Sequence, residues 1–109
     1  MNEQVKEYIE KFPSEIITLF SELRQLIYDS ASSDTDETLW AKIPSYYVGE
    51  KFVRLIPFKD HLNIEATVIT EHKEELTEYK ITPKGMLQIF INQEIPTDIL
   101  KRIFAATFG

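Results

Sequence analysis

The hydrophobic pattern of this 109-residue chain changes between residues 31 and 37, and that change constrains the fold more than any other feature. Before it, apolar residues recur every three or four positions, as they do in amphipathic helices. After it, aromatic and β-branched residues dominate segments 39–48 and 51–58, which flank a Gly49-Glu50 turn and so resemble a β-hairpin. Helices followed by a run of strands are typical of an α+β domain.

The same pattern predicts where the elements lie. We expect helices over residues 2–12 and 13–30, the second starting at Pro13, where the missing N–H costs no hydrogen bond. The remaining elements are expected as strands 39–48, 51–58 and 61–66, a helix over 68–79, a strand over 86–91 and a last helix from Pro96. The order is ααβββαβα, with an antiparallel sheet of about four strands packed with helices in one domain over residues 1–109.

The whole negative charge excess lies in the first third of the chain. The net charge is −6; residues 1–37 hold nine acids and three bases, whereas residues 38–109 hold nine of each sign. The nine acids are Glu3, Glu7, Glu10, Glu15, Glu22, Asp29, Asp34, Asp36 and Glu37. The first six fall into two helical stripes that are expected to be exposed, and the last three fall in a polar loop.

Carboxylate oxygens are the ligands that hard cations prefer, so these nine acids are candidate metal ligands. Within the first stripe, Glu7 is close enough to Glu3 or Glu10 on a helix to share an ion with either. Neighbours in the second stripe are seven residues apart, which is roughly 10 Å along a helix, so they cannot form one cage. The alternative is a solvated helix surface that keeps a small protein soluble.

Several classes of function are disfavoured. There is no basic excess for binding nucleic acid and no apolar run of about 18 residues to span a membrane. No cysteine is present for a thiolate site, and His61 and His72 lack zinc-site spacing. Glycine-rich nucleotide loops and the nucleophile motif of hydrolases are missing as well. We therefore expect a non-enzymatic role, and the lack of a signal peptide at the N-terminus favours the cytoplasm.

A second candidate site is the aromatic strand region, which could bind a small molecule or a protein. Its residues would be Trp40, Pro44, Tyr46, Lys59 and His61. Aromatic side chains would line an apolar cleft, with a lysine as polar anchor. The alternative is that these side chains only pack the two faces of the sheet.

The chain also resembles the YdhG-like family of small bacterial domains, and the match covers nearly its whole length in the right order. The matching stretches are Leu23-Arg24-Gln25-Leu26-Ile27, Glu37 to Pro44, Phe58-Lys59-Asp60-His61, Leu76 to Tyr79, Lys84-Gly85, and Pro96 to Phe104. Two stretches depart from the family pattern. Lys42-Ile43-Pro44 replaces Gly-Met-Pro, and Ile64-Glu65-Ala66 replaces an aromatic-Pro pair.

The resemblance implies a frataxin-like architecture, with helices on one side of an antiparallel sheet. It also implies an accessory role in which iron binds weakly to an acidic surface for delivery to iron–sulfur or haem assembly proteins. The acids of residues 1–37 would then hold the iron, although the family supplies no signature that aligns them one by one.

Overall fold

The predicted meander forms the centre of a six-stranded antiparallel sheet in a computed structural model that describes residues 1–109. Its strands are β1 (Asp36–Trp40), β2 (Ile43–Val48), β3 (Lys51–Pro57), β4 (His61–Glu65), β5 (Lys80–Ile81) and β6 (Leu87–Phe90). They lie in the order β1-β2-β3-β4-β6-β5. The α+β class is confirmed, but the sheet has two strands more than the four we predicted.

The predicted first, second and last helices are confirmed as α1 (Glu3–Ile9), α2 (Ser14–Ser30) and α3 (Thr97–Phe108). Asn2 caps α1, because its side-chain oxygen accepts hydrogen bonds from the backbone N–H groups of Gln4 and Val5. Pro13 and Pro96 precede α2 and α3, as the sequence indicated. None of these helices is both long and apolar enough to cross a membrane.

The prediction of one strand over residues 39–48 was wrong. The chain reverses at Ala41 and Lys42, which both have positive φ, and so separates β1 from β2. A two-residue turn with both residues in this conformation matches the right-handed twist of the paired strands. Asn and Gly favour such turns, and neither stands here, so the sequence lacks the usual signal. As a result, Asp36 and Glu37 lie in β1 and not in the predicted loop.

The predicted helix over residues 68–79 is confirmed only in part. The segment forms only a 3-10 helix, Ile69–Glu75, with a kink at His72. It begins in a run of four β-branched residues, which have lower helix propensity than unbranched ones. The chain then adds β5 at the edge of the sheet, next to β6.

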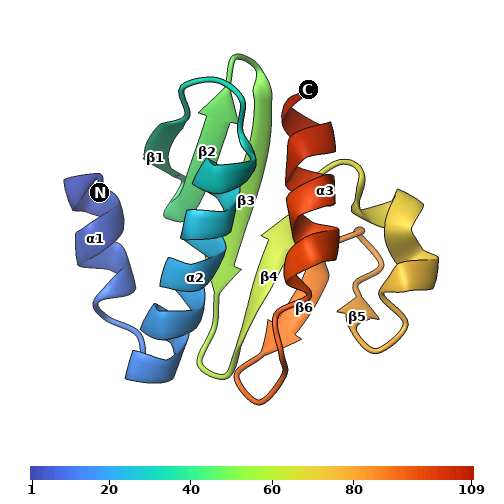
Figure 1. The fold of residues 1–109 in the computed structure, drawn as a ribbon. Helices are drawn as coiled ribbons and strands as arrows, with labels where there is room; N and C mark the ends of the chain where they lie inside the picture. Colours follow the sequence, from blue (N-terminus) through green and yellow to red (C-terminus); the bar gives the residue numbers. More distant parts are fainter.

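The sheet has one covered face and one open face. In Figure 1, α2 and α3 lie side by side across one face, with α1 next to β1. The apolar residues of these helices and of the covered face form one cluster of 22 buried residues, with Phe20, Tyr46 and Phe104 among the largest. No helix lies across the opposite face of the sheet (Figure 1).

Candidate functional site

Of the nine predicted metal ligands, all except Glu37 are exposed and form no ion pair. Glu3, Glu7 and Glu10 lie on or directly after α1, and Glu15, Glu22 and Asp29 lie on α2. Asp34 precedes β1, and Asp36 begins it. No group of three or more acidic, histidine or cysteine side chains is placed to hold one ion. The structure therefore spreads the predicted ligands over two helices and a strand.

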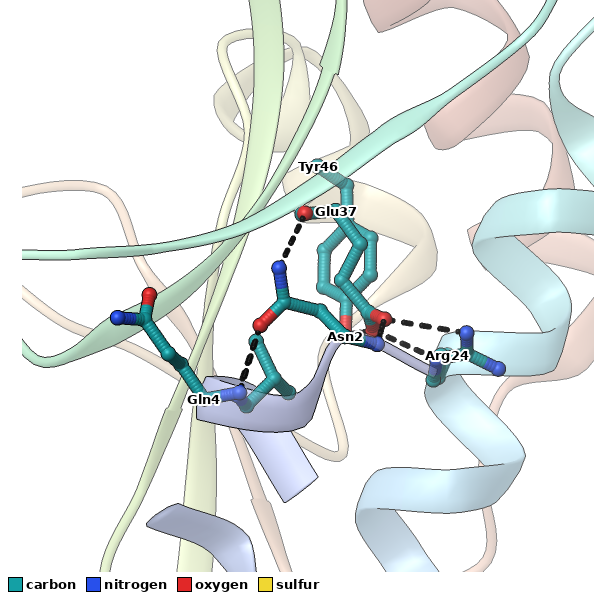
Figure 2. A network of polar contacts seen from close by, with 6 residues as sticks. Asn2, Gln4, Arg24, Glu37 and Tyr46 are labelled. Carbon is teal, nitrogen blue, oxygen red and sulfur yellow. Dashed lines mark hydrogen bonds and ion pairs between the residues drawn. The ribbon is translucent and has the colours of Figure 1, made fainter. Parts of the chain in front are cut away.

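Glu37 has a different environment from the other eight acids, because its side chain is only 5% exposed. It forms an ion pair with Arg24 of α2, with Nε–Oε2 and Nη2–Oε1 distances of 2.6 and 3.2 Å. The Tyr46 hydroxyl of β2 donates a hydrogen bond of 2.8 Å to Oε2, and the Asn2 backbone N–H donates one of 2.7 Å to Oε1 (Figure 2). This carboxylate joins the start of α1, the middle of α2, and strands β1 and β2.

The contacts of Glu37 decide its ionisation. Burial alone would raise the pKa of this carboxyl, but the hydrogen bonds from Arg24, Asn2 and Tyr46 outweigh burial and hold the pKa below its ordinary value. The same burial and the nearby carboxylate raise the pKa of the Tyr46 hydroxyl, which stays protonated and donates. Glu37 is therefore a fully paired structural carboxylate, and its position argues against a role as an exposed metal ligand.

The open face of the sheet carries most of the exposed aromatic side chains. We define it as the strand side chains that point away from the helices, together with Phe58, which directly follows β3. By strand register they are Asp36, Thr38, Trp40, Ile43, Ser45, Tyr47, Phe52, Arg54, Ile56, His61, Asn63, Glu65, Lys80, Gln88 and Phe90. Two of the largest exposed apolar side chains of the chain, Trp40 and Phe58, belong to this face.

Arg54 organises the half of the open face near β1. Its guanidinium lies 4.1 Å from the ring centroid of Trp40 and 3.8 Å from that of Phe52. It also donates hydrogen bonds to the hydroxyls of Ser45 and Tyr47, at 3.2 and 3.1 Å. Stacking of a guanidinium on aromatic rings is favourable and holds those rings in place. Trp40 is thus fixed from one side while remaining 51% exposed.

His61 forms a second aromatic group with the rings that flank it. Its ring stacks on Phe58 at a centroid distance of 4.5 Å and lies 4.8 Å from Phe90. The Nδ1 atom is 2.8 Å from a carboxylate oxygen of Asp60, which fixes the orientation of the ring. The last residues of β1 and β3 and the first residues of β4 lie at the same end of the sheet. Trp40 and the aromatic group around His61 therefore both lie at that end.

Asn63 follows His61 by two residues in β4, so the two side chains lie on the same face. Its neighbours Leu62 and Ile64 point into the core, so its own side chain points to the open face. It is 9% exposed, and its side-chain oxygen is buried without a hydrogen-bond partner. Buried polar atoms of native proteins are nearly always paired with protein groups or ordered water, so this acceptor is an exception within the fold.

The structure does not bring together the five residues of the predicted aromatic site. Trp40 and His61 belong to the open face, and Lys59 is exposed in the turn between β3 and β4. Pro44 and Tyr46 point the other way and are buried under the helices. None of the five main surface hollows is lined by any of these residues. None of these five hollows is therefore the predicted aromatic cleft.

Sequence reasoning missed Arg54 and Asn63 as members of this surface. The available signal was the alternation of side chains along β3 and β4, which places Arg54 between Val53 and Leu55, and Asn63 between two buried residues. A polar residue inside an apolar strand indicates the face turned away from the core. What alternation alone does not reveal is which other strands bring their aromatics beside it.

Comparisons with protein-family models, curated proteins and solved structures give no match for this chain. The resemblance to the YdhG-like family therefore stays a prediction from the sequence.

Proposed function

We propose that this protein is a non-enzymatic binding module whose open sheet face docks on a partner protein. The observation that carries this proposal is the uncovered face itself, on which Arg54 stacks on the exposed Trp40 and His61 stacks on the exposed Phe58. Tryptophan, tyrosine and arginine are the residues that contribute most to binding at protein interfaces. Exposed apolar patches rimmed by polar groups are typical of interaction sites.

The shape of this face favours a protein over a small molecule as its ligand. Small-molecule sites are concave and enclose most of the ligand, whereas the hollows of this chain lie away from Trp40, His61 and Asn63.

Site-specific photo-crosslinking in cells that naturally express the protein tests this proposal. The photoreactive residue benzoylphenylalanine replaces Phe58 on the open face or, as a control, Glu22 on α2, since both positions are exposed. We expect covalent protein adducts at position 58 that diminish when Trp40→Ser is added, and fewer at position 22. Equal adducts at both positions, or none at position 58, would contradict a docking role for the open face.

The iron-binding accessory role is a second candidate, and the acids of α1 favour it. Glu3, Glu7 and Glu10 are exposed and carry no ion pair, so their oxygens are accessible to a cation. Delivery to iron–sulfur or haem assembly proteins would then use this helix. With at most two neighbouring carboxylates for each ion, we expect a dissociation constant in the micromolar range or weaker.

An anaerobic Fe²⁺ titration followed by amide NMR tests the iron role. Signal changes should gather in α1 and α2, and Glu7→Gln should weaken them. The matched control is Glu74→Gln, an exposed acid in the 3-10 segment, which should leave the titration unchanged. Changes spread evenly over the chain, or their absence from residues 1–37, would exclude the role.

A further inference from the structure

The outer edge of β1 is paired near its start and unpaired near its end. β1 is an edge strand, and its residues alternately turn their backbone N–H and C=O groups toward β2 and away from it. The carbonyl oxygen of Glu37 points away from β2 and accepts a hydrogen bond of 3.2 Å from the Asn2 side chain (Figure 2). By the same alternation the backbone groups of Leu39 point outward, and the opposite residue, Pro44, has no N–H to give. No other group of the chain pairs with Leu39, so its N–H and C=O are free for an added strand.

A hollow of about 380 Å³ lies between α1 and the end of β1. On the α1 side its residues are spaced i, i+3, i+4 and i+7, as they are on one face of a helix. The other wall is the last part of β1 with the turn that follows. The lining residues are Gln4, Glu7, Tyr8, Lys11, Leu39 and Lys42. A peptide lying in this hollow would therefore run beside Leu39, with α1 on its other side.

The charges around this hollow favour an anionic group. Lys11 and Lys42 stand against a single acid, Glu7, and neither lysine forms an ion pair in the chain. In the other four main hollows the acids equal or outnumber the bases. Burial raises the pKa of the Tyr8 hydroxyl, which therefore stays protonated and can donate a hydrogen bond. A carboxylate would complement these donors.

The end of β1 also limits how far an added strand can extend. Two residues beyond Leu39, at Ala41, the chain already reverses into β2. A segment that pairs with Leu39 therefore runs out of edge beside Lys42, the second residue of this turn. Glycine is favoured at that turn position, so the turn itself does not require a lysine there. A chain that terminates at this point would bring its carboxylate to the lysines that line the hollow.

From these observations we infer that the edge of β1 binds the C-terminal segment of a partner protein, with the Leu39 backbone pairing the segment and Lys11 and Lys42 holding its carboxylate. Addition of a strand to a sheet edge and capture of a terminal carboxylate are both recurring modes of peptide recognition. This site uses the edge of the sheet and none of the exposed aromatic rings of the open face. It therefore does not depend on the docking role proposed above.

Selection of peptides by the full-length chain tests this inference. The probe is a random hexapeptide library displayed with free carboxyl termini, and enriched sequences are then synthesised with either a free or an amidated C-terminus. We expect the amides to bind about tenfold more weakly, because amidation removes the charged acceptor that the lysines hold. Hydrogen exchange of the Leu39 amide should slow when a free-carboxyl peptide is bound, since its N–H then has a partner.

Lys42→Gly removes one of the two lysines and also suits the positive φ of this position, so the turn stays intact. It should weaken binding of the enriched peptides about fivefold. The matched control is Lys101→Gln, which removes an exposed base of α3 without an ion pair and should leave binding unchanged. Circular dichroism verifies that both variants are folded.

Three results would each overturn the inference. The first is a library from which no sequence is enriched. The second is equal binding of acids and amides, which would mean that the site does not recognise a terminal carboxylate. The third is binding that Lys42→Gly leaves unchanged, which would place the peptide elsewhere on the chain.

Discussion

Replacing Glu37 with glutamine is expected to lower the free energy of unfolding by about 3 kcal/mol, because removing one partner of a buried ion pair leaves the other charge uncompensated. This value is at the lower end of the loss usual for breaking a buried ion pair, because Arg24 is still 22% exposed. The variant also places an amide where Asn2 and Tyr46 donate hydrogen bonds. Urea denaturation measures the loss as a lower midpoint with an unchanged slope.

The matched control is Glu22→Gln, which removes an exposed acid of α2 with no ion pair. Its expected effect lies within about 0.5 kcal/mol of the wild type. Similar losses for both variants would mean that the Glu37 network contributes nothing beyond charge, contrary to the geometry in Figure 2.

The same carboxylate predicts how stability depends on pH. The folded protein holds the pKa of Glu37 below its ordinary value of 4.5, so the carboxylate contributes its full stabilisation above that value. The contribution is lost as the pH falls below 4.5 and through the lowered pKa of the folded state. The difference in midpoint between wild type and Glu37→Gln should therefore shrink on acidification. A difference that stays constant to low pH would contradict the assigned ion pair.

A second large effect is expected for Phe20→Ala in α2, which should cost about 4 kcal/mol, because it deletes a ring from a packed core and leaves a cavity. Phe20 is fully buried. For a domain whose total stability is about 5–15 kcal/mol, this loss brings the fold close to unfolding at ordinary temperature. Thermal and urea denaturation measure the change.

Phe58→Ala is the natural comparison, since it removes the same ring from the open face. Its expected cost is about 1 kcal/mol or less, because the ring is 42% exposed and stacks on the His61 ring at the surface. If Phe58→Ala proved as costly as Phe20→Ala, the open face would be part of the folding core and not a surface kept for binding.

Both helical segments before residue 31 could be predicted because their apolar residues follow helical spacing without interruption. The same is true of α3, where Leu100, Ile103 and Phe104 all reach the core. The prediction failed at the Ala41-Lys42 turn, whose residues have no strong turn preference. It held only in part at the 3-10 segment, where apolar residues at helical spacing begin in a β-branched run. Spacing alone does not distinguish a short irregular segment that buries one side from a regular helix.

The sequence by itself determined the α+β class, the three α-helices and the location of the negative charge, since each depends on residues near one another along the chain. Only the tertiary structure decided which acid is buried and which sheet residues remain uncovered. Glu37 looks like the other acids in the sequence, yet its partners Asn2, Arg24 and Tyr46 come from α1, α2 and β2. Likewise, Trp40 and Tyr46 are both strand aromatics, and the register of β1 and β2 sends one to the open face and the other to the core. Such contacts join residues that are distant in the chain, so they exist only once the sheet and helices have packed.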